Sequence, residues 1–230
     1  MRICFAIINY KFFHSHRLSL IRELAKTHSV SVVTDTSRAL PQEIKNLISL
    51  GIEVIHLPSR SKKIGYISYA LSLRRVIQNI NPVMMFYVTL EMSTFGATIH
   101  HLLKVKKSFF LITGLGPFFH RKKLKYSGLR LLQRLIFAAA LLKKSCVFIF
   151  QNADDLKLFI DLKIANETNV QMIRGNGINT NAFIYKERAY VNKIIFLYAS
   201  RLVLSKGIVE FINASRLLKR KYPEAEFLIA

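Results

Sequence analysis

Short apolar runs alternate with longer amphipathic stretches along almost the whole chain. The runs are nearly all apolar, which is typical of parallel strands that are buried on both faces. The stretches between them place apolar residues at helical spacing, so each is expected to pack on the sheet as a connecting helix. The pattern therefore predicts an α/β protein with a Rossmann-like parallel sheet that has helices on both faces.

The apolar runs give the predicted strands, which are 3–8, 29–34, 52–57, 83–88, 108–113, 146–151, 170–173, 194–199 and 226–229. The predicted helices are 19–26, 41–50, 66–79, 93–103, 124–142, 153–162 and 208–221. In open parallel sheets, ligands bind outside the carboxyl ends of the strands. Functional residues are therefore expected directly after strands.

A polar stretch between two strand-helix blocks predicts the domain organisation. Residues 1–180 are expected to form a first Rossmann-like domain, with 181–192 as a linker. Residues 193–230 contain one strand-helix-strand unit, and such a unit buries too little apolar surface to stand alone. They are predicted to be the incomplete start of a second Rossmann-like domain.

Charge and cysteine content narrow the class of protein. Lys and Arg number 35 against 13 Asp and Glu, a net charge of +22, which predicts an anionic partner. Cys4 and Cys146 lie in separate apolar runs, which excludes a disulfide scaffold and a cysteine-based zinc site. The first apolar run is too short for a signal peptide, and no run is long enough to span a bilayer. These features predict a cytoplasmic location.

The segment 9–17 follows the first predicted strand as a loop and contains Ser15, His16 and Arg17. A helix start behind it favours anions, so the segment is interpreted as a polar pocket for a substrate with phosphate or hydroxyl groups. The alternative is a serine helix cap beside solvated His and Arg side chains.

Three further segments follow predicted strands. Thr113, Gly114 and Gly116 would let a ligand approach the backbone closely, or form only a tight turn. Gly175 and Gly177 lie in a second glycine-rich segment after a predicted strand. In the third segment, Arg201 and Lys206 flank a predicted helix start. They could neutralise a diphosphate by charge-assisted hydrogen bonds, or be ordinary surface cations.

Taken together, these segments resemble family-4 glycosyltransferases of the GT-B architecture. Within this family, the chain resembles most the bacterial branch that extends polyprenyl-diphosphate-linked sugars in capsule, O-antigen or glycoprotein assembly. It rests on Phe12-Phe13-x-Ser15-His16-Arg17, Ile112-Thr113-Gly114-Leu115-Gly116, Phe150-Gln151-Asn152-x-Asp154-Asp155, Gly175-Asn176-Gly177-Ile178-Asn179 and Ala199-Ser200-Arg201-Leu202 with Lys206-Gly207.

The resemblance implies transfer of a sugar, with retention of configuration, from a nucleotide-sugar (UDP-linked) to a lipid-linked acceptor. It implies no cofactor and no metal, because basic residues and a helix start stabilise the leaving diphosphate. The implied acceptor-binding residues are Ser15, His16, Arg17, Thr113, Gly114 and Gly116. The implied donor-binding residues are Gly175, Gly177, Arg201 and Lys206, of which the last two are also the catalytic pair.

The family's Glu-x7-Glu donor element is absent from this sequence, so the chain alone is predicted to be inactive. The alternative to an enzyme is a non-enzymatic, membrane-associated remnant domain that binds lipid phosphates or a partner transferase.

The charge distribution predicts which part of the chain would contact a membrane. Residues 92–153 contain no Asp or Glu but 11 Lys and Arg, and helix 124–142 is basic and amphipathic. This composition favours the anionic inner face of the cytoplasmic membrane as a peripheral contact. The alternative is a core-facing helix with a solvated basic face. Nucleic acid is not expected as a partner, because aromatic and basic residues are not interleaved. The predicted membrane-facing residues are Arg121, Lys122, Lys123, Lys125, Arg130 and Arg134.

Overall fold

The computed structural model describes residues 1–60, 65–115, 125–143, 145–181, 183–187 and 194–230. The chain forms two compact units, Met1–Asn179 and Thr180–Ala230. Within the described residues, no helix is long and apolar enough to cross a membrane. The functional roles predicted for the two parts of the chain stay predictions.

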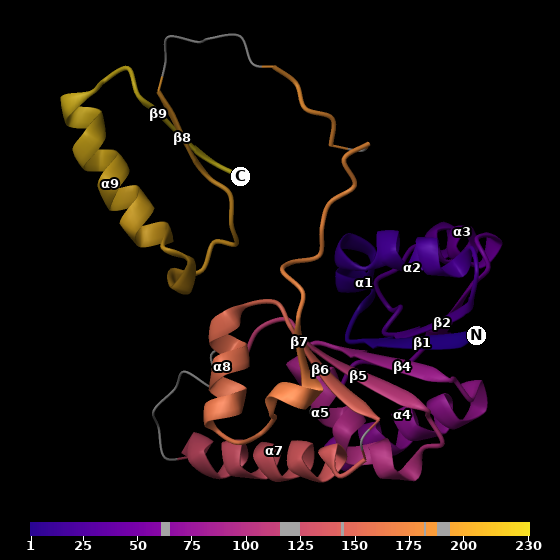
Figure 1. The fold of residues 1–230 in the computed structure, drawn as a ribbon. Helices are drawn as coiled ribbons and strands as arrows, with labels where there is room; N and C mark the ends of the chain where they lie inside the picture. The colour runs from indigo at the N-terminus through magenta and orange to yellow at the C-terminus, as the bar shows by residue number, and fades with distance from the viewer. Residues whose placement is uncertain (61–64, 116–124, 144, 182, 188–193) are drawn as a thin grey trace. The chain divides into compact units, whose positions relative to one another are not determined.

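The first unit is built on a seven-stranded parallel sheet (Figure 1). Its strand order is β3-β2-β1-β4-β5-β6-β7, and every neighbouring pair is parallel. The predicted parallel Rossmann-like sheet is therefore confirmed. The strands are β1 (Arg2–Ile7), β2 (Ser29–Thr34), β3 (Ile52–His56), β4 (Met84–Val88), β5 (Lys107–Ile112), β6 (Cys146–Phe150) and β7 (Val170–Met172).

Helices cover both faces of this sheet, as predicted. On one face lie α1 (Tyr10–His16), α2 (Leu18–Ala25) and α3 (Pro41–Ser49). On the other face lie α4 (Tyr66–Ile80), α5 (Leu90–Ile99), α7 (Lys125–Leu141) and α8 (Ala153–Asp161). Two short 3-10 helices, η1 (His100–Leu102) and η2 (Glu167–Asn169), lie before β5 and β7.

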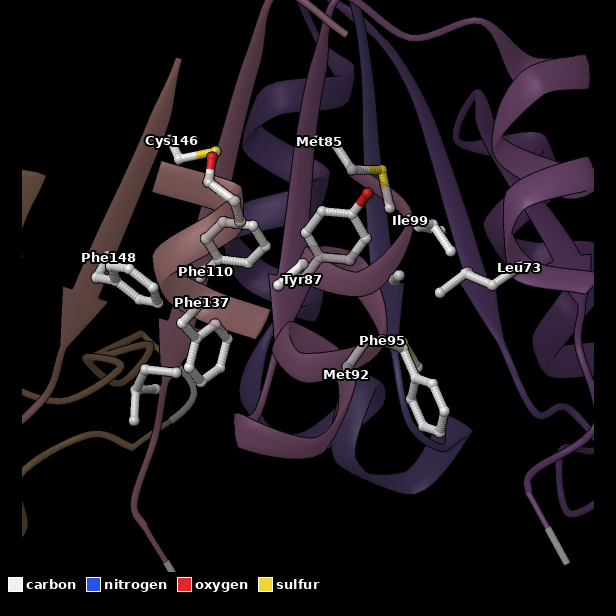
Figure 2. Packing of buried hydrophobic residues seen from close by; sticks show 14 of the residues in the cluster. Leu73, Met85, Tyr87, Met92, Phe95, Ile99, Phe110, Phe137, Cys146 and Phe148 are labelled. Carbon is white, nitrogen blue, oxygen red and sulfur yellow. The ribbon is translucent and has the colours of Figure 1, made fainter. Parts of the chain in front are cut away.

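The core under α4, α5, α7 and α8 is aromatic, and Figure 2 shows its centre. Tyr87 of β4 stacks on Phe110 of β5, and Phe110 contacts Phe137 of α7. Gly96 lies against the Tyr87 ring, where any β-carbon would overlap the ring atoms. The missing side chain of Gly96 thus lets α5 pack closely on β4, whose carboxyl end leads to the candidate site.

The segment 9–17 is a helix for most of its length, which corrects the predicted loop. Asn9, and not a serine, caps α1, because its side-chain oxygen accepts a hydrogen bond from the Phe12 N–H (2.9 Å). Tyr10 and Phe13 are buried on one side of α1 and anchor it to the sheet. The structure also starts α5 at Leu90, three residues before the predicted start.

A buried histidine lies at the opposite, amino-terminal edge of the sheet. The His100 ring contacts the Ser108 hydroxyl (3.2 Å) and the Cys146 sulfur (3.1 Å), and the Cys146 thiol donates to the Ala140 carbonyl (3.3 Å). Burial, helped by Lys143, lowers the pKa of His100 to about 4. Burial raises the pKa of Cys146 to about 12, so this thiol is a structural group and not a nucleophile.

We expect His100 to make the fold less stable as the pH falls from about 6.5 to about 4. The unfolded chain binds the proton throughout this window and the folded chain does not, so the free energy of unfolding drops, by about 2 kcal/mol. Urea unfolding at pH 7 and at pH 4.5 measures the drop. His100→Asn should remove it, while the exposed control His14→Asn should keep it. An equal drop in wild type and His100→Asn would contradict this assignment.

The second unit contains a single strand-helix-strand unit. Strands β8 (Ile195–Tyr198) and β9 (Glu226–Ile229) pair in parallel, and α9 (Ile208–Lys221) connects them. The 3-10 helix η3 (Leu204–Lys206) precedes α9. Phe211 of α9 contacts both Tyr198 and Phe227, which holds the helix on the strand pair.

Candidate functional site

The strand order of the first unit predicts a binding site at the carboxyl ends of β1 and β4. From β1 the chain winds outward to β2 and β3, and then returns to place β4 on the other side of β1. At such a switch point the two connections leave in opposite directions, which opens a crevice at the carboxyl ends of the strands. Asn9 follows β1 and Thr89 follows β4, so both lie at this point.

Thr89 has a backbone conformation that its side chain disfavours. Its φ of 88° lies in the region that β-branched residues rarely enter. The Thr89 N–H donates to the Leu111 carbonyl (3.0 Å), and its hydroxyl accepts from the Met92 N–H (3.4 Å). Such strain is often found at functional sites. The sequence analysis did not single out Thr89, because its positive φ cannot be read from the amino-acid sequence.

Asp35 ties together the loops that follow β1, β2 and β3. Its carboxylate accepts hydrogen bonds from the Ser37 N–H (2.9 Å) and the Ser59 N–H (2.8 Å). Its carbonyl accepts from the Tyr10 N–H (3.1 Å). Burial would raise the pKa of Asp35, but the hydrogen bonds from Ser59 and Ser37 outweigh burial and hold this pKa well below its usual range. Asp35 is thus an anion that fixes the rim of the crevice.

Ser15 and His16 form the last turn of α1 and are exposed. The Ser15 hydroxyl donates to the Lys11 carbonyl (2.7 Å) and lies 2.6 Å from Nδ1 of His16. The His16 ring stacks on Phe12 with centroids 4.5 Å apart. Both side chains already have intrahelical contacts, and His16 can still present its second ring nitrogen to a ligand.

Arg17 lies where α1 ends and α2 begins, and it is only 6% exposed. Within the described part of the chain, its Nε and Nη2 atoms are buried and have no hydrogen-bond partner. Burial lowers the pKa of Arg17. A buried guanidinium without a counter-charge is costly, so it is the strongest sign of a missing anion in this unit.

Thr113 and Gly114 follow β5, the strand next to β4, and both are half-buried. Gly114 has a φ of 150°, and a side chain there would meet open space. Gly116, predicted as the third member of this group, lies outside the described residues.

Gly175 and Gly177 follow β7 at the edge of the sheet, and each has a positive φ, of 68° and 67°. The Gln151 side-chain amide donates to the Asn176 side-chain oxygen, which joins the end of β6 to this turn. Both glycines therefore have conformations that other residues disfavour. Their predicted role in donor binding stays a prediction.

Arg201 and Lys206 belong to the second unit. Tyr198 at the end of β8 donates from its hydroxyl to the Arg201 carbonyl (3.0 Å), and Lys206 ends η3. Gly207, with a φ of 80°, then begins α9. Both cationic side chains are exposed, so they are available to an anion at the start of α9.

Of the residues predicted to face a membrane, Arg121, Lys122 and Lys123 lie outside the described residues. Lys125 and Arg130 lie on α7, and Arg134 of the same helix is half-buried. In the described part of α7, Leu131, Leu132 and Leu135 are more than half exposed. Among the described residues, no group of three or more His, Cys, Asp or Glu side chains could hold a metal.

The seven-stranded parallel sheet of the first unit, with helices on both faces, is a Rossmann-like fold that matches solved structures of GT-B glycosyltransferases, and solved UDP-GlcNAc 2-epimerases have a similar fold. The glycosyl transferase 4-like family model matches residues 2–152, and the chain belongs to this family. The predicted resemblance to family-4 GT-B glycosyltransferases is thereby confirmed.

A relative of known name is a glycosyltransferase. A Campylobacter jejuni N,N'-diacetylbacillosaminyl-diphospho-undecaprenol alpha-1,3-N-acetylgalactosaminyltransferase is 27% identical over 161 residues. The match covers 65% of this chain and 42% of that enzyme, so the chain matches less than half of its relative.

Two solved structures share the fold over the whole chain. Anabaena HepE, in complex with UDP and glucose, has a TM-score of 0.66 at 14% identity, with 60% of its length covered. Sucrose-phosphate synthase from Thermosynechococcus elongatus has a TM-score of 0.65 at 11% identity, with 62% of its length covered.

Proposed function

We propose that the protein transfers a sugar from a nucleotide-sugar to a membrane lipid-linked acceptor, a polyprenyl-diphosphate saccharide, in the assembly of a bacterial surface glycan. The observation that carries the proposal is that Nε and Nη2 of Arg17 are buried without a hydrogen-bond partner among the described residues, in a chain of the glycosyl transferase 4-like family. The diphosphate of such an acceptor supplies the missing anion. The Campylobacter relative, which is named for a diphospho-undecaprenol substrate, supports this acceptor class.

In this proposal the crevice at β1 and β4 holds the acceptor. Arg17 binds the acceptor diphosphate, and Ser15 and His16, the two residues directly before it, contact the acceptor from the exposed end of α1. Thr113 and Gly114 leave room for the acceptor sugar beside the end of β5. The strained turn at Thr89 fixes the first turn of α5 at the crevice.

The donor is a UDP-sugar, and the residues proposed to bind it are Gly175, Gly177, Arg201 and Lys206. HepE, with which the chain shares its fold, was solved with UDP and glucose. Arg201 and Lys206 stabilise the leaving diphosphate, because two cations beside a helix start can neutralise charge that develops there. The sugar is transferred with retention of configuration, and no metal or cofactor takes part.

We place the protein at the inner face of the cytoplasmic membrane as a peripheral protein. Its net charge of +22 and the exposed leucines of α7 suit an anionic lipid surface. Residues 1–230 alone do not catalyse transfer, because the family's Glu-x7-Glu donor element is absent from them.

A partition assay tests the proposed function. The complete gene product, given a labelled UDP-sugar and a polyprenyl-diphosphate saccharide, should move label into the organic phase. The free saccharide without its lipid should accept far less, and the 230-residue chain alone should move none. If the complete product moves no label to any lipid-linked acceptor, the non-enzymatic lipid-binding alternative is favoured instead.

A further inference from the structure

A small apolar hollow lies at the amino-terminal edge of the sheet, at the opposite ends of the strands from the candidate site. It has a volume of about 240 Å³ and is formed where α4 ends and β5 begins. Ile77 of α4, Pro82 and Leu102 of η1 make its lining apolar. The exposed Gln78 and Asn81 add polar groups to it. In Figure 1 the chain's N-terminus, where β1 begins, marks this edge.

The hollow is suited to one side chain of a partner. Its volume is below the range of about 300–1,000 Å³ that is usual for small-molecule sites. Leu102 in its wall is 52% exposed, so apolar surface is open to solvent there. In protein interfaces, a single side chain that fills such a pocket often contributes much of the binding energy. An apolar anchor residue therefore fits the hollow better than a cofactor does.

Three exposed lysines border the hollow. Lys104 lines it, and Lys106 and Lys107 follow at the start of β5. The backbone N–H groups of Lys106 and Lys107 donate to the Val83 carbonyl (3.1 and 3.3 Å), which places both residues beside the segment that contains Pro82. In the part of the chain that the structure describes, none of the three lysines forms an ion pair. The lysines thus give this edge a concentrated positive charge.

Two other cations at this edge have roles in the fold. Arg2 donates to the Ile80 carbonyl at the end of α4 (2.6 Å), and Lys143 donates to the His101 carbonyl of η1 (3.4 Å). Such contacts are typical of basic residues near helix C-termini. Lys104 has no comparable contact among the described residues, so its charge is available to an anionic partner.

We infer that this edge docks an acidic peptide segment of a partner protein, with an apolar side chain of that segment in the hollow. Charge complementarity favours this occupant, because residues 92–153 contain 11 Lys and Arg and no Asp or Glu, and three of these lysines border the hollow. A single-stranded nucleic acid would need aromatic side chains on which its bases stack. None of the described residues that line the hollow is aromatic.

The location separates this partner from the lipid-linked acceptor. In the proposed function the acceptor binds at the carboxyl ends of the parallel strands, and the hollow lies at their amino ends. A protein docked here therefore leaves the acceptor crevice open. The inference goes beyond the proposed function and rests on it only for this orientation.

A synthetic peptide tests the inference on the 230-residue chain. A fluorescein-labelled peptide with two glutamates on each side of a central leucine should show saturable binding by fluorescence anisotropy at low salt. A peptide with serine in place of the leucine should bind at least about five-fold more weakly, because it lacks the buried apolar side chain. Equal affinity for the two peptides, or no saturable binding of the leucine peptide, would overturn the inference.

Matched double substitutions separate the docking edge from the net charge of the chain. Lys104→Glu with Lys107→Glu should weaken the leucine peptide at least about ten-fold, because two attractions become repulsions. Lys45→Glu with Lys157→Glu changes the net charge equally at exposed positions of α3 and α8, and should change the affinity less than about two-fold. Equal losses in the two variants would overturn the inference, with circular dichroism confirming that both fold.

Two further probes test the other anionic partners. A labelled uridine hexanucleotide and vesicles of phosphatidylethanolamine with phosphatidylglycerol are each titrated with wild type and with the Lys104→Glu, Lys107→Glu variant. Loss of RNA or vesicle binding in this variant, with peptide binding unchanged, would overturn the inference in favour of that other partner. The complete gene product with the same two substitutions should transfer sugar as wild type does, so failure of the docking edge and failure of the proposed function are separate results.

Discussion

Arg17→Met is expected to make the fold more stable and to weaken binding of the lipid-linked acceptor. Arg17 is 6% exposed, and its Nε and Nη2 atoms have no hydrogen-bond partner in the described part of the chain. Methionine fills similar space without a buried unpaired charge, so the free energy of unfolding should rise by about 1–3 kcal/mol. Loss of the diphosphate contact should lower kcat/KM for the lipid-linked acceptor on the order of 100-fold.

The exposed Arg22 of α2 provides the matched control for this substitution. Arg22→Met removes the same charge from the same helix pair and should change neither quantity by much. Urea unfolding gives the stability and steady-state kinetics of the complete gene product give kcat/KM. An Arg17→Met protein that is less stable and transfers sugar normally would show that Arg17 is a structural residue.

Arg201→Ala should lower kcat by about two orders of magnitude or more, the size of effect seen when a group that stabilises transition-state charge is removed. The KM for the nucleotide-sugar should change less than kcat, because the charge on the leaving diphosphate develops mainly in the transition state. Arg220→Ala, which removes an exposed arginine of α9 in the same unit, is the control. Near-normal kcat in Arg201→Ala would contradict the donor-side assignment.

Both predictions concern residues that the sequence singled out. The burial of Arg17, on which the first prediction depends, is known only from the structure. The sequence places an arginine among polar residues after the first strand, which is compatible with a solvated side chain. Its burial depends on how α1 and α2 turn over the sheet, because neighbours from distant parts of the chain exclude water. Such packing is not encoded in a local pattern.

The parallel sheet was predictable because its strands are continuous apolar runs bounded by polar residues. The helix α1 was not, since it has seven residues, with two histidines and two phenylalanines, and lacks an acidic first turn. The early start of α5 depends on the positive φ of Thr89, which sequence does not reveal. The pocket lined by Arg60, Tyr66, Leu90 and Leu132 brings together residues 60 to 136 from four segments, so no single motif could indicate it.

The central claim is tested most directly by the stoichiometry of one reaction. The complete gene product is incubated with a UDP-sugar and a polyprenyl-diphosphate saccharide, and mass spectrometry measures the lipid while the released UDP is quantified. The account predicts a lipid product that is heavier by one sugar residue for each UDP released. Release of UDP without a heavier lipid, or a sugar that appears only on a water-soluble product, would contradict it.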